Sequence, residues 1–264
     1  MNRFFFYLVV VSSLLFGIND QMKASEEDSN QAKTPRLCVL KLDDVVAGRG
    51  GQVVPERWQR VADFLEGKKV KSSMGVIGFS LVDDNPAYFK WITDRAARGY
   101  IEFWNHGFRN RSADDPLGEF EGGYDEQIRA LRLTDSLVRV KLGLNLTTWG
   151  PHWSGCNEHT DRALAQMPII RMTFGFPLKT TLFKGFVIPR SIDMEFPTHN
   201  PDYETFKKVY QAREFDLDFF FLQGHPNSWD EPRWENFVKI IEFLQAEGVR
   251  FVTPSELFKI LFDK

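Results

Sequence analysis

The sequence contains little cysteine. Only two cysteines, Cys38 and Cys156, occur among its 264 residues. Cys38 stands near the start of a predicted strand, whereas Cys156 follows a loop that we place at the opposite end of the sheet. Five or more extended residues span roughly 17 Å, and a disulfide requires Cα atoms within ~7 Å of each other. We therefore predict that both thiols are free.

The sequence also lacks an excess of positive charge. The net charge is −3, the isoelectric point is near 6.0, and lysine and arginine are dispersed along the chain. Such a surface has no field that would hold a polyanion, so nucleic acid is not expected as a partner. No segment of about 20 to 50 residues repeats, which argues against a solenoid.

No apolar run is long enough to cross a membrane. Arg3 precedes an apolar segment over residues 4–15, whereas a membrane-spanning helix needs ~20 apolar residues. A polar stretch follows, and the pattern is typical of a signal peptide. We place the signal peptide at 1–24 and a polar linker at 25–35, and we expect a secreted or periplasmic protein without stable membrane insertion after cleavage. A retained N-terminal anchor is the competing interpretation.

Strand and helix patterns alternate along the rest of the chain, and we assign residues 36–264 to one domain. Apolar runs predict strands at 36–42, 70–81, 100–105, 144–149, 169–174, 181–189, 217–223 and 249–252. Helical periodicity predicts helices at 55–66, 86–98, 124–142, 160–167, 203–215, 231–247 and 254–261. Such alternation implies parallel pairing with right-handed crossovers. The predicted fold is α/β, a single irregular (β/α) barrel of about seven strands.

Two adjacent carboxylates, Asp43 and Asp44, follow the first predicted strand, and a glycine-rich loop comes next. Side chains alternate along a strand, so both acids can reach one site only where the strand is already curling away. Two carboxylates in a common pocket cannot both ionise freely. One can then serve as a base while the other is held by a cation.

Polar residues also follow three later strands. These are His106, the segment 150–152 that contains His152, and His225. The carboxyl ends of barrel strands converge on one face, so these residues are expected to meet Asp43 and Asp44 there. The chain has only five histidines, and three of them follow predicted strands. The other two, His159 and His199, are expected to face solvent.

The order of these motifs, over residues 37–261, resembles that of the polysaccharide deacetylases, which use one divalent metal to remove acetyl groups from N- or O-acetylated sugars. The resemblance implies that Asp43 is the catalytic base and Asp44 a metal ligand. It implies that His106 is a second ligand, and that Asn110 stands where the family has another histidine ligand. The late histidine of the family, its general acid, matches His225.

The resemblance also implies a substrate groove lined by Pro151, His152 and Trp153. Flat aromatic rings suit sugar faces, so Trp104 and Trp229, which lie beside these segments, are further candidates for substrate binding. The expected partner is an acetylated oligo- or polysaccharide. Either Asp193 or Glu195 is expected beside His225, where a carboxylate would hold its charged form.

Asn110 departs from the family pattern, because an amide is a poorer zinc ligand than an imidazole. Three outcomes follow: weak binding of a divalent metal, with zinc expected, through the Asn110 oxygen; recruitment of His152 as a replacement ligand; or loss of metal and turnover. Two other functions stay open. One is a catalytically impaired glycan-binding protein that uses the tryptophans, and the other is a glycosidase that pairs Asp43 with Glu102 or Glu195.

Overall fold

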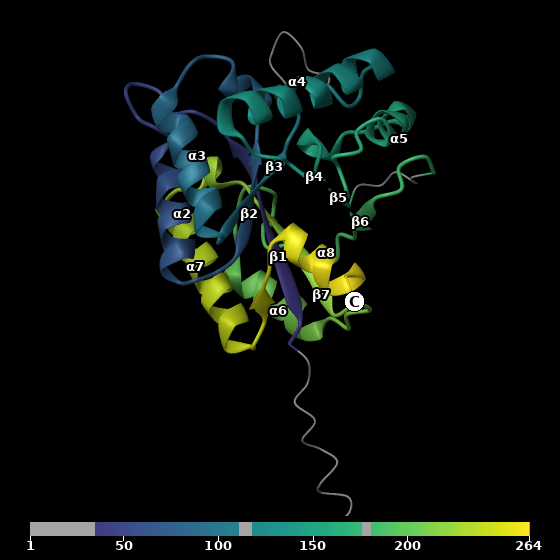
Figure 1. Cartoon of the computed structure of the whole chain (residues 1–264). Helices are drawn as coiled ribbons and strands as arrows, with labels where there is room; N and C mark the ends of the chain where they lie inside the picture. Colours follow the sequence, from purple (N-terminus) through teal and green to yellow (C-terminus); the bar gives the residue numbers. More distant parts are fainter. Residues whose placement is uncertain (1–34, 111–117, 176–180, 264) are drawn as a thin grey trace, which may run out of the picture. The chain divides into compact units, whose positions relative to one another are not determined.

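Eight strands form one parallel sheet in the computed structural model, which describes residues 35–110, 118–175 and 181–263 (Figure 1). The predicted signal peptide, and the linker up to residue 34, lie outside the described residues. The strands are β1 (Leu37–Val45), β2 (Ser72–Val76), β3 (Ile101–Asn105), β4 (Thr148–Trp149), β5 (Met172–Phe174), β6 (Phe186–Ile188), β7 (Phe219–Gly224) and β8 (Arg250–Phe251).

The sheet curls into a nearly closed barrel. Its strand order is β6-β5-β4-β3-β2-β1-β7, and β8 pairs with the first residues of β1, at Leu37 and Cys38. Within the described ranges no ladder joins β6 to β7. Side chains bridge that gap instead, since the rings of Phe186 and Phe219 meet edge to face with centroids 6.0 Å apart. The predicted irregular (β/α) barrel is confirmed.

Helices connect the strands and cover the outside of the sheet. In Figure 1, α2, α3 and α7 lie side by side along one flank, where Phe64 of α2 packs on Trp234 of α7. The helices are α2 (Glu56–Gly67), α3 (Pro86–Arg98), α4 (Tyr124–Leu142), α5 (Glu158–Ala165), α6 (Tyr203–Ala212), α7 (Glu231–Ala246) and α8 (Pro254–Phe262), with short 3-10 turns η1 (Gly78–Leu81), η2 (His152–Ser154) and η3 (Pro226–Ser228).

Local signals in the sequence account for the helix boundaries. Asn85 caps α3 by accepting the Tyr88 N–H, and Gly99 ends the helix with φ of 76°. A left-handed residue at a helix end is adopted most easily by glycine. One prediction was wrong here, because the second strand stops at Val76 instead of residue 81. Its chain leaves the sheet when the Gly78 N–H bonds to the Gly107 carbonyl, and η1 follows.

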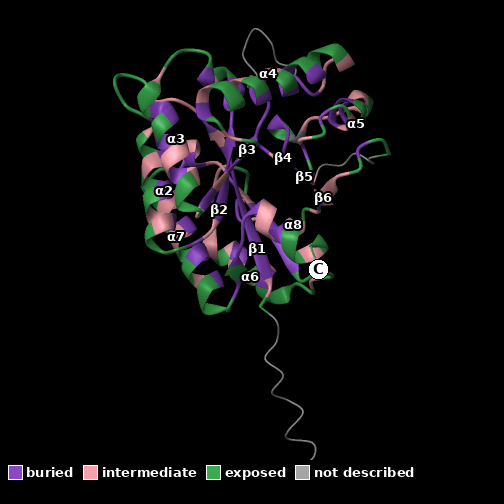
Figure 2. Cartoon of the chain, viewed as in Figure 1, coloured by how far each residue is buried: buried purple, intermediate pink, exposed green. Residues whose placement is uncertain are grey.

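Alternate residues of β1 face two different cores. Figure 2 shows that the central strands of the sheet are buried. Cys38, Leu40 and Leu42 pack outward against the helices, whereas Leu37 and Val39 point into the barrel. By the same alternation, Lys41 and Asp43 continue the inward row towards the carboxyl end of the strand. Along β1, the barrel interior is therefore apolar at the amino end of the strand and charged at its carboxyl end.

Two further features concern thiols and membranes. Cys38 is buried and Cys156 is half-buried, and among the described residues neither is joined in a disulfide. Within the described ranges, none of the helices combines the length and hydrophobicity that a bilayer span requires.

Candidate metal centre and active site

The end of β1 delivers both Asp43 and Asp44 to one site. Asp44 has a left-handed backbone, with φ of 77°, and the register with β2 shifts between Leu42 and Val45. This bulge turns the Asp44 side chain to the same side as Asp43, as expected for a strand that curls away. The Asp44 carbonyl accepts hydrogen bonds from the Trp58 indole at 3.2 Å and from the Asn227 amide at 2.9 Å. These bonds hold a conformation that is costly for an aspartate.

The strand ends open into a cavity of about 340 Å³. All of the histidines expected at strand ends reach it together with both aspartates. The residues that line it are Asp43, Asp44, His106, Asn110, His152, Trp153, Arg190, Asp193, Glu195, Thr198, His199, Gln223 and His225. The structure therefore brings together the ends of β1, β3 and β7 and the turn η2 that follows β4.

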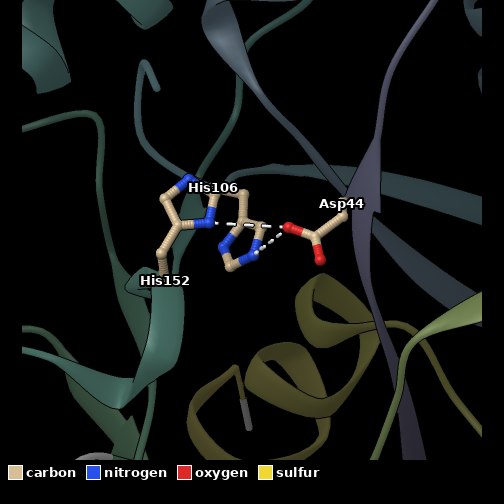
Figure 3. Close-up of side chains that lie close together, drawn as sticks. All are labelled: Asp44, His106 and His152. Carbon is tan, nitrogen blue, oxygen red and sulfur yellow. Dashed lines mark ion pairs between the residues drawn. The ribbon is translucent and has the colours of Figure 1, made fainter. Parts of the chain in front are cut away.

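Asp44, His106 and His152 form a compact group of potential metal ligands (Figure 3). One ligand atom from each lies within 4.8 Å of the others. Asp44 Oδ1 is 3.3 Å from His106 Nε2 and 3.5 Å from His152 Nδ1. His106 Nδ1 lies 2.8 Å from the Gly150 carbonyl, which can only accept a hydrogen bond. His106 Nδ1 therefore donates to this carbonyl, and Nε2 is the ring nitrogen that faces Asp44.

The electrostatics of this group fit a cation. Asp44 Oδ1 is buried and makes no hydrogen bond among the described residues. Burial alone would raise the pKa of Asp44, but the two imidazoles beside it hold the pKa well below its usual range. Burial, together with the nearby His106, lowers the pKa of His152 to about 4. A carboxylate and two imidazoles thus face one point, and that donor set suits zinc and other divalent transition metals.

Asp43 is held by Lys41, a residue that the sequence reasoning missed. Lys41 Nζ lies 2.6 Å from Asp43 Oδ1 and 2.5 Å from Oδ2, and both side chains are buried. Gln223 Nε2 also donates to Asp43 Oδ2, at 2.9 Å. Burial lowers the pKa of Lys41, and its carboxylate neighbours oppose that shift. The available signal was a lysine in an apolar strand, two positions before Asp43 and therefore on the same face.

His225 is paired with Glu195. His225 Nδ1 lies 2.6 Å from Glu195 Oε2, and His225 Nε2 lies 3.7 Å from Asp43 Oδ2. Burial would lower the pKa of His225, but Glu195 and Asp43 outweigh it and raise that pKa. Asp193, the other candidate, pairs instead with Arg190. The two possibilities left open by the sequence are thus resolved in favour of Glu195.

Three predicted residues lie at the mouth of the cavity or beside it. The Asn110 oxygen accepts a hydrogen bond from the Trp153 indole at 2.9 Å. Trp153 is 61% exposed and has a left-handed backbone, with φ of 57°. Pro151 is buried directly before η2. The structure therefore puts His152 into the group around Asp44 and places the Asn110 oxygen beside the Trp153 indole.

Other expectations need correction. Trp104 and Trp229 are only 0% and 3% exposed, so neither has a ring face free for a sugar. Trp104 fills the barrel, where a Cβ on Gly75 would lie 2.5 Å from its ring. The Trp229 indole donates to Glu195 Oε1 at 2.9 Å. His199 was expected to face solvent, yet it lines the cavity.

The contacts of Glu102 and Glu195 do not suit the two predicted glycosidase pairs. Glu102 stands at the start of β3, the end opposite to Asp43, and binds the Ser255 N–H and hydroxyl. Glu195 has both oxygens engaged by His225, His199 and Trp229. Burial opposes its ionisation, but these donors lower the pKa of Glu195, so it is not suited to protonate a leaving group.

Comparison with known proteins identifies the fold. A family 4 acetyl xylan esterase from Clostridium thermocellum, solved with a cobalt ion, superposes with a TM-score of 0.59 and 18% identity over 85% of this chain and 91% of that one. A peptidoglycan deacetylase from Bacillus subtilis gives a TM-score of 0.56 and 17% identity over 87% of this chain and 93% of that one. The chain therefore has the deacetylase fold that its motifs predicted.

A further structure with this fold is described as a pseudoenzyme. It is a CE4 family protein from Bacillus anthracis, with a TM-score of 0.58 and 15% identity over 85% of this chain and 66% of that one. A mutant of it is described as having restored enzymatic activity. No protein-family model and no curated protein sequence matches this chain. At these identities the comparison extends to the fold and no further.

Proposed function

We propose that this protein is a metal-dependent hydrolase that removes acetyl groups from N- or O-acetylated carbohydrate. One observation carries the proposal: a single cavity holds the Asp44–His106–His152 group next to Asp43 and His225. A divalent cation bound by that group would polarise the acyl carbonyl and acidify a water molecule. We propose zinc, because two imidazoles and a carboxylate are a common zinc set.

Asp43 is proposed as the general base. Its carboxylate lies within 3.8 Å of His106 and within 3.7 Å of His225, between the ligand group and the proposed acid. There it would accept a proton from the attacking water. Lys41 and Gln223 would fix the orientation of the carboxylate, since both donate to its oxygens.

His225 is proposed as the general acid. The Glu195 carboxylate stabilises its imidazolium form through Nδ1. The opposite nitrogen, Nε2, then carries the proton that would pass to the leaving nitrogen or oxygen. The raised pKa of His225 keeps that proton available near neutral pH.

His152 is proposed as the third metal ligand, in the role that the family resemblance would give to Asn110. Two observations support this: His152 Nδ1 faces the same Asp44 oxygen as His106 Nε2, and the Asn110 oxygen is engaged by Trp153. The exposed face of Trp153, at the cavity mouth, would stack on a sugar ring. The predicted signal peptide would export the protein to where an extracellular or periplasmic polysaccharide could serve as its substrate.

Metal analysis of four proteins tests the ligand assignment. Each protein is first stripped of metal by chelation and dialysis, and zinc is then added. We expect the wild type to bind about one equivalent of zinc, and His152→Ala to bind zinc about tenfold to a hundredfold more weakly. Asn110→His should bind zinc no more tightly than the wild type, and it should not rescue His152→Ala. Tight zinc binding by Asn110→His alone would assign the third ligand to position 110.

Acetate release tests the reaction. Chelated protein should be inactive towards acetylated oligosaccharides, and zinc, cobalt or nickel should restore release of acetate. Asp43→Asn should abolish the activity while zinc binding is retained. If the wild type binds zinc and acetylated oligosaccharide but releases no acetate with any metal, the glycan-binding alternative is correct. Shortened chains without acetate would instead indicate glycosidase chemistry.

A further inference from the structure

His199 occupies a strained and well-fixed place beside the proposed acid. Its backbone is left-handed, with φ of 75°, which costs free energy for any residue with a Cβ. The loop around it is closed by the Phe196 N–H to the Asn200 carbonyl at 2.8 Å and by the Asn200 N–H to the Pro197 carbonyl at 3.0 Å. Among the residues described, two of the other three non-glycine residues with positive φ, Asp44 and Trp153, line the same cavity.

His199 makes two contacts with the Glu195–His225 pair, one through its backbone N–H and one through its ring. The His199 N–H donates to Glu195 Oε2 at 2.7 Å, and that same oxygen holds His225 Nδ1 at 2.6 Å. The His199 ring meets the His225 ring edge to face, with centroids 4.5 Å apart and planes at 88°. Both rings line the cavity.

The His225 ring has a short hydrogen bond to Glu195 at Nδ1 and a longer contact at Nε2, where Gln223 Nε2 lies 3.3 Å away. These two contacts leave the ring able to tilt about the axis that joins its two nitrogens. A second ring packed at right angles against it removes much of this freedom, because the tilt would cause a clash or open a gap. The groups that face His225 are then Glu195 and His199 on one side and Asp43, Lys41 and Gln223 on the other. Nε2 is left pointing towards Asp43, where the leaving group would take its proton.

We propose that His199 is a positioning residue for His225. Its N–H orients the Glu195 carboxylate, and its ring holds the His225 imidazole with Nε2 aimed into the cavity. This role rests on the proposed function, because it gives His225 its task as acid. The predicted consequence is that the ring of residue 199 matters for proton donation while its ability to ionise does not.

Three substitutions separate the backbone from the ring. His199→Gly keeps the N–H and relieves the strain, so its thermal midpoint should equal or exceed that of the wild type. His199→Asn also tolerates a left-handed backbone but has no ring. His199→Phe keeps a flat ring that cannot ionise. We expect kcat for acetate release to fall about tenfold to a hundredfold in the Gly and Asn variants, with KM unchanged, and to be retained in His199→Phe.

A readout that does not need turnover completes the test. The Nδ1 proton of His225 can be followed by NMR and assigned through its loss in His225→Gln. We expect it to exchange with solvent faster in His199→Gly and His199→Asn than in the wild type and His199→Phe. Unchanged exchange in all three variants, or a raised KM at constant kcat, would overturn the positioning role. Faster exchange in a protein that releases no acetate would leave the positioning intact and refute only the proposed function.

Discussion

At the scale of single residues, the site depends on a buried ammonium that neutralises a buried carboxylate. Lys41 and Asp43 are both nearly inaccessible to water, and Lys41 also lies over the Trp104 ring at 5.0 Å from its centroid. Burying a charge is costly unless a partner compensates it. The pair therefore stabilises the fold only while both members are present.

Removal of the Lys41 ammonium should destabilise the folded protein. We expect Lys41→Met to lower the free energy of unfolding by about 3 kcal/mol, because it leaves Asp43 buried without its cation. Lys41→Arg should recover part of the loss. Urea unfolding measures both effects, and Lys68→Met is the control, since its pair with Glu242 is about half exposed and should matter little. Equal costs at positions 41 and 68 would contradict this account.

The pairing of His225 with Glu195 should govern the pH dependence of activity. Burial lowers the pKa of His225, but Glu195 and Asp43 together raise it by more, so the imidazole stays protonated to a higher pH than an ordinary histidine. Activity should therefore fall on the alkaline side, as the acid loses its proton. Glu195→Gln should move that alkaline limb to lower pH. A pH–rate profile with an unmoved alkaline limb would show that another group is the acid.

At the scale of elements, Glu119 anchors the segment that follows β3. Its two oxygens accept the Phe108 N–H at 2.7 Å and the Arg109 N–H at 3.0 Å. That segment carries His106 at its start, so the carboxylate fixes the backbone next to a proposed metal ligand. Burial raises the pKa of Glu119 to about 7, although the two N–H donors oppose the shift.

A carboxyl group with a raised pKa makes stability depend on pH in a definite direction. The folded state binds the Glu119 proton more tightly than the unfolded state, so this contribution is full below about pH 4.5 and is lost as pH rises through about 7. We expect the loss of unfolding free energy from pH 5 to pH 8 to be smaller in Glu119→Gln than in the wild type by on the order of 1–2 kcal/mol. Urea unfolding at both pH values checks this, and equal losses would exclude Glu119 as the source.

At the scale of the whole molecule, the barrel is closed by side chains where the strand ladder ends. Phe219 of β7 is buried and packs on Phe186 of β6. We expect Phe219→Ala to lower the free energy of unfolding by roughly 3 kcal/mol. Phe79→Ala is the matched control, because Phe79 is 63% exposed and should cost little. Similar costs for the two variants would mean that the β6–β7 contact does not contribute to closure.

The order of strands and helices could be predicted because neighbouring residues encode it. The apolar run of β1, the Asn85 cap and the terminal Gly99 of α3 act within a few residues of their own positions. Parallel pairing then brings the strand ends to one face, so the meeting of Asp43, His106 and His225 also followed from the pattern. The end of β2 could not be predicted in this way, since it depends on a hydrogen bond from Gly78 to the distant Gly107.

Tertiary structure alone decided which polar groups pair. Whether His152 or Asn110 faces Asp44, and whether Glu195 or Asp193 holds His225, depends on the path of loops that join distant strands. Trp104 could not be distinguished from a sugar-binding ring, because the burial of a ring depends on neighbours contributed by other strands. Local interactions thus specify the elements of this protein, whereas contacts between residues far apart in the chain specify its site.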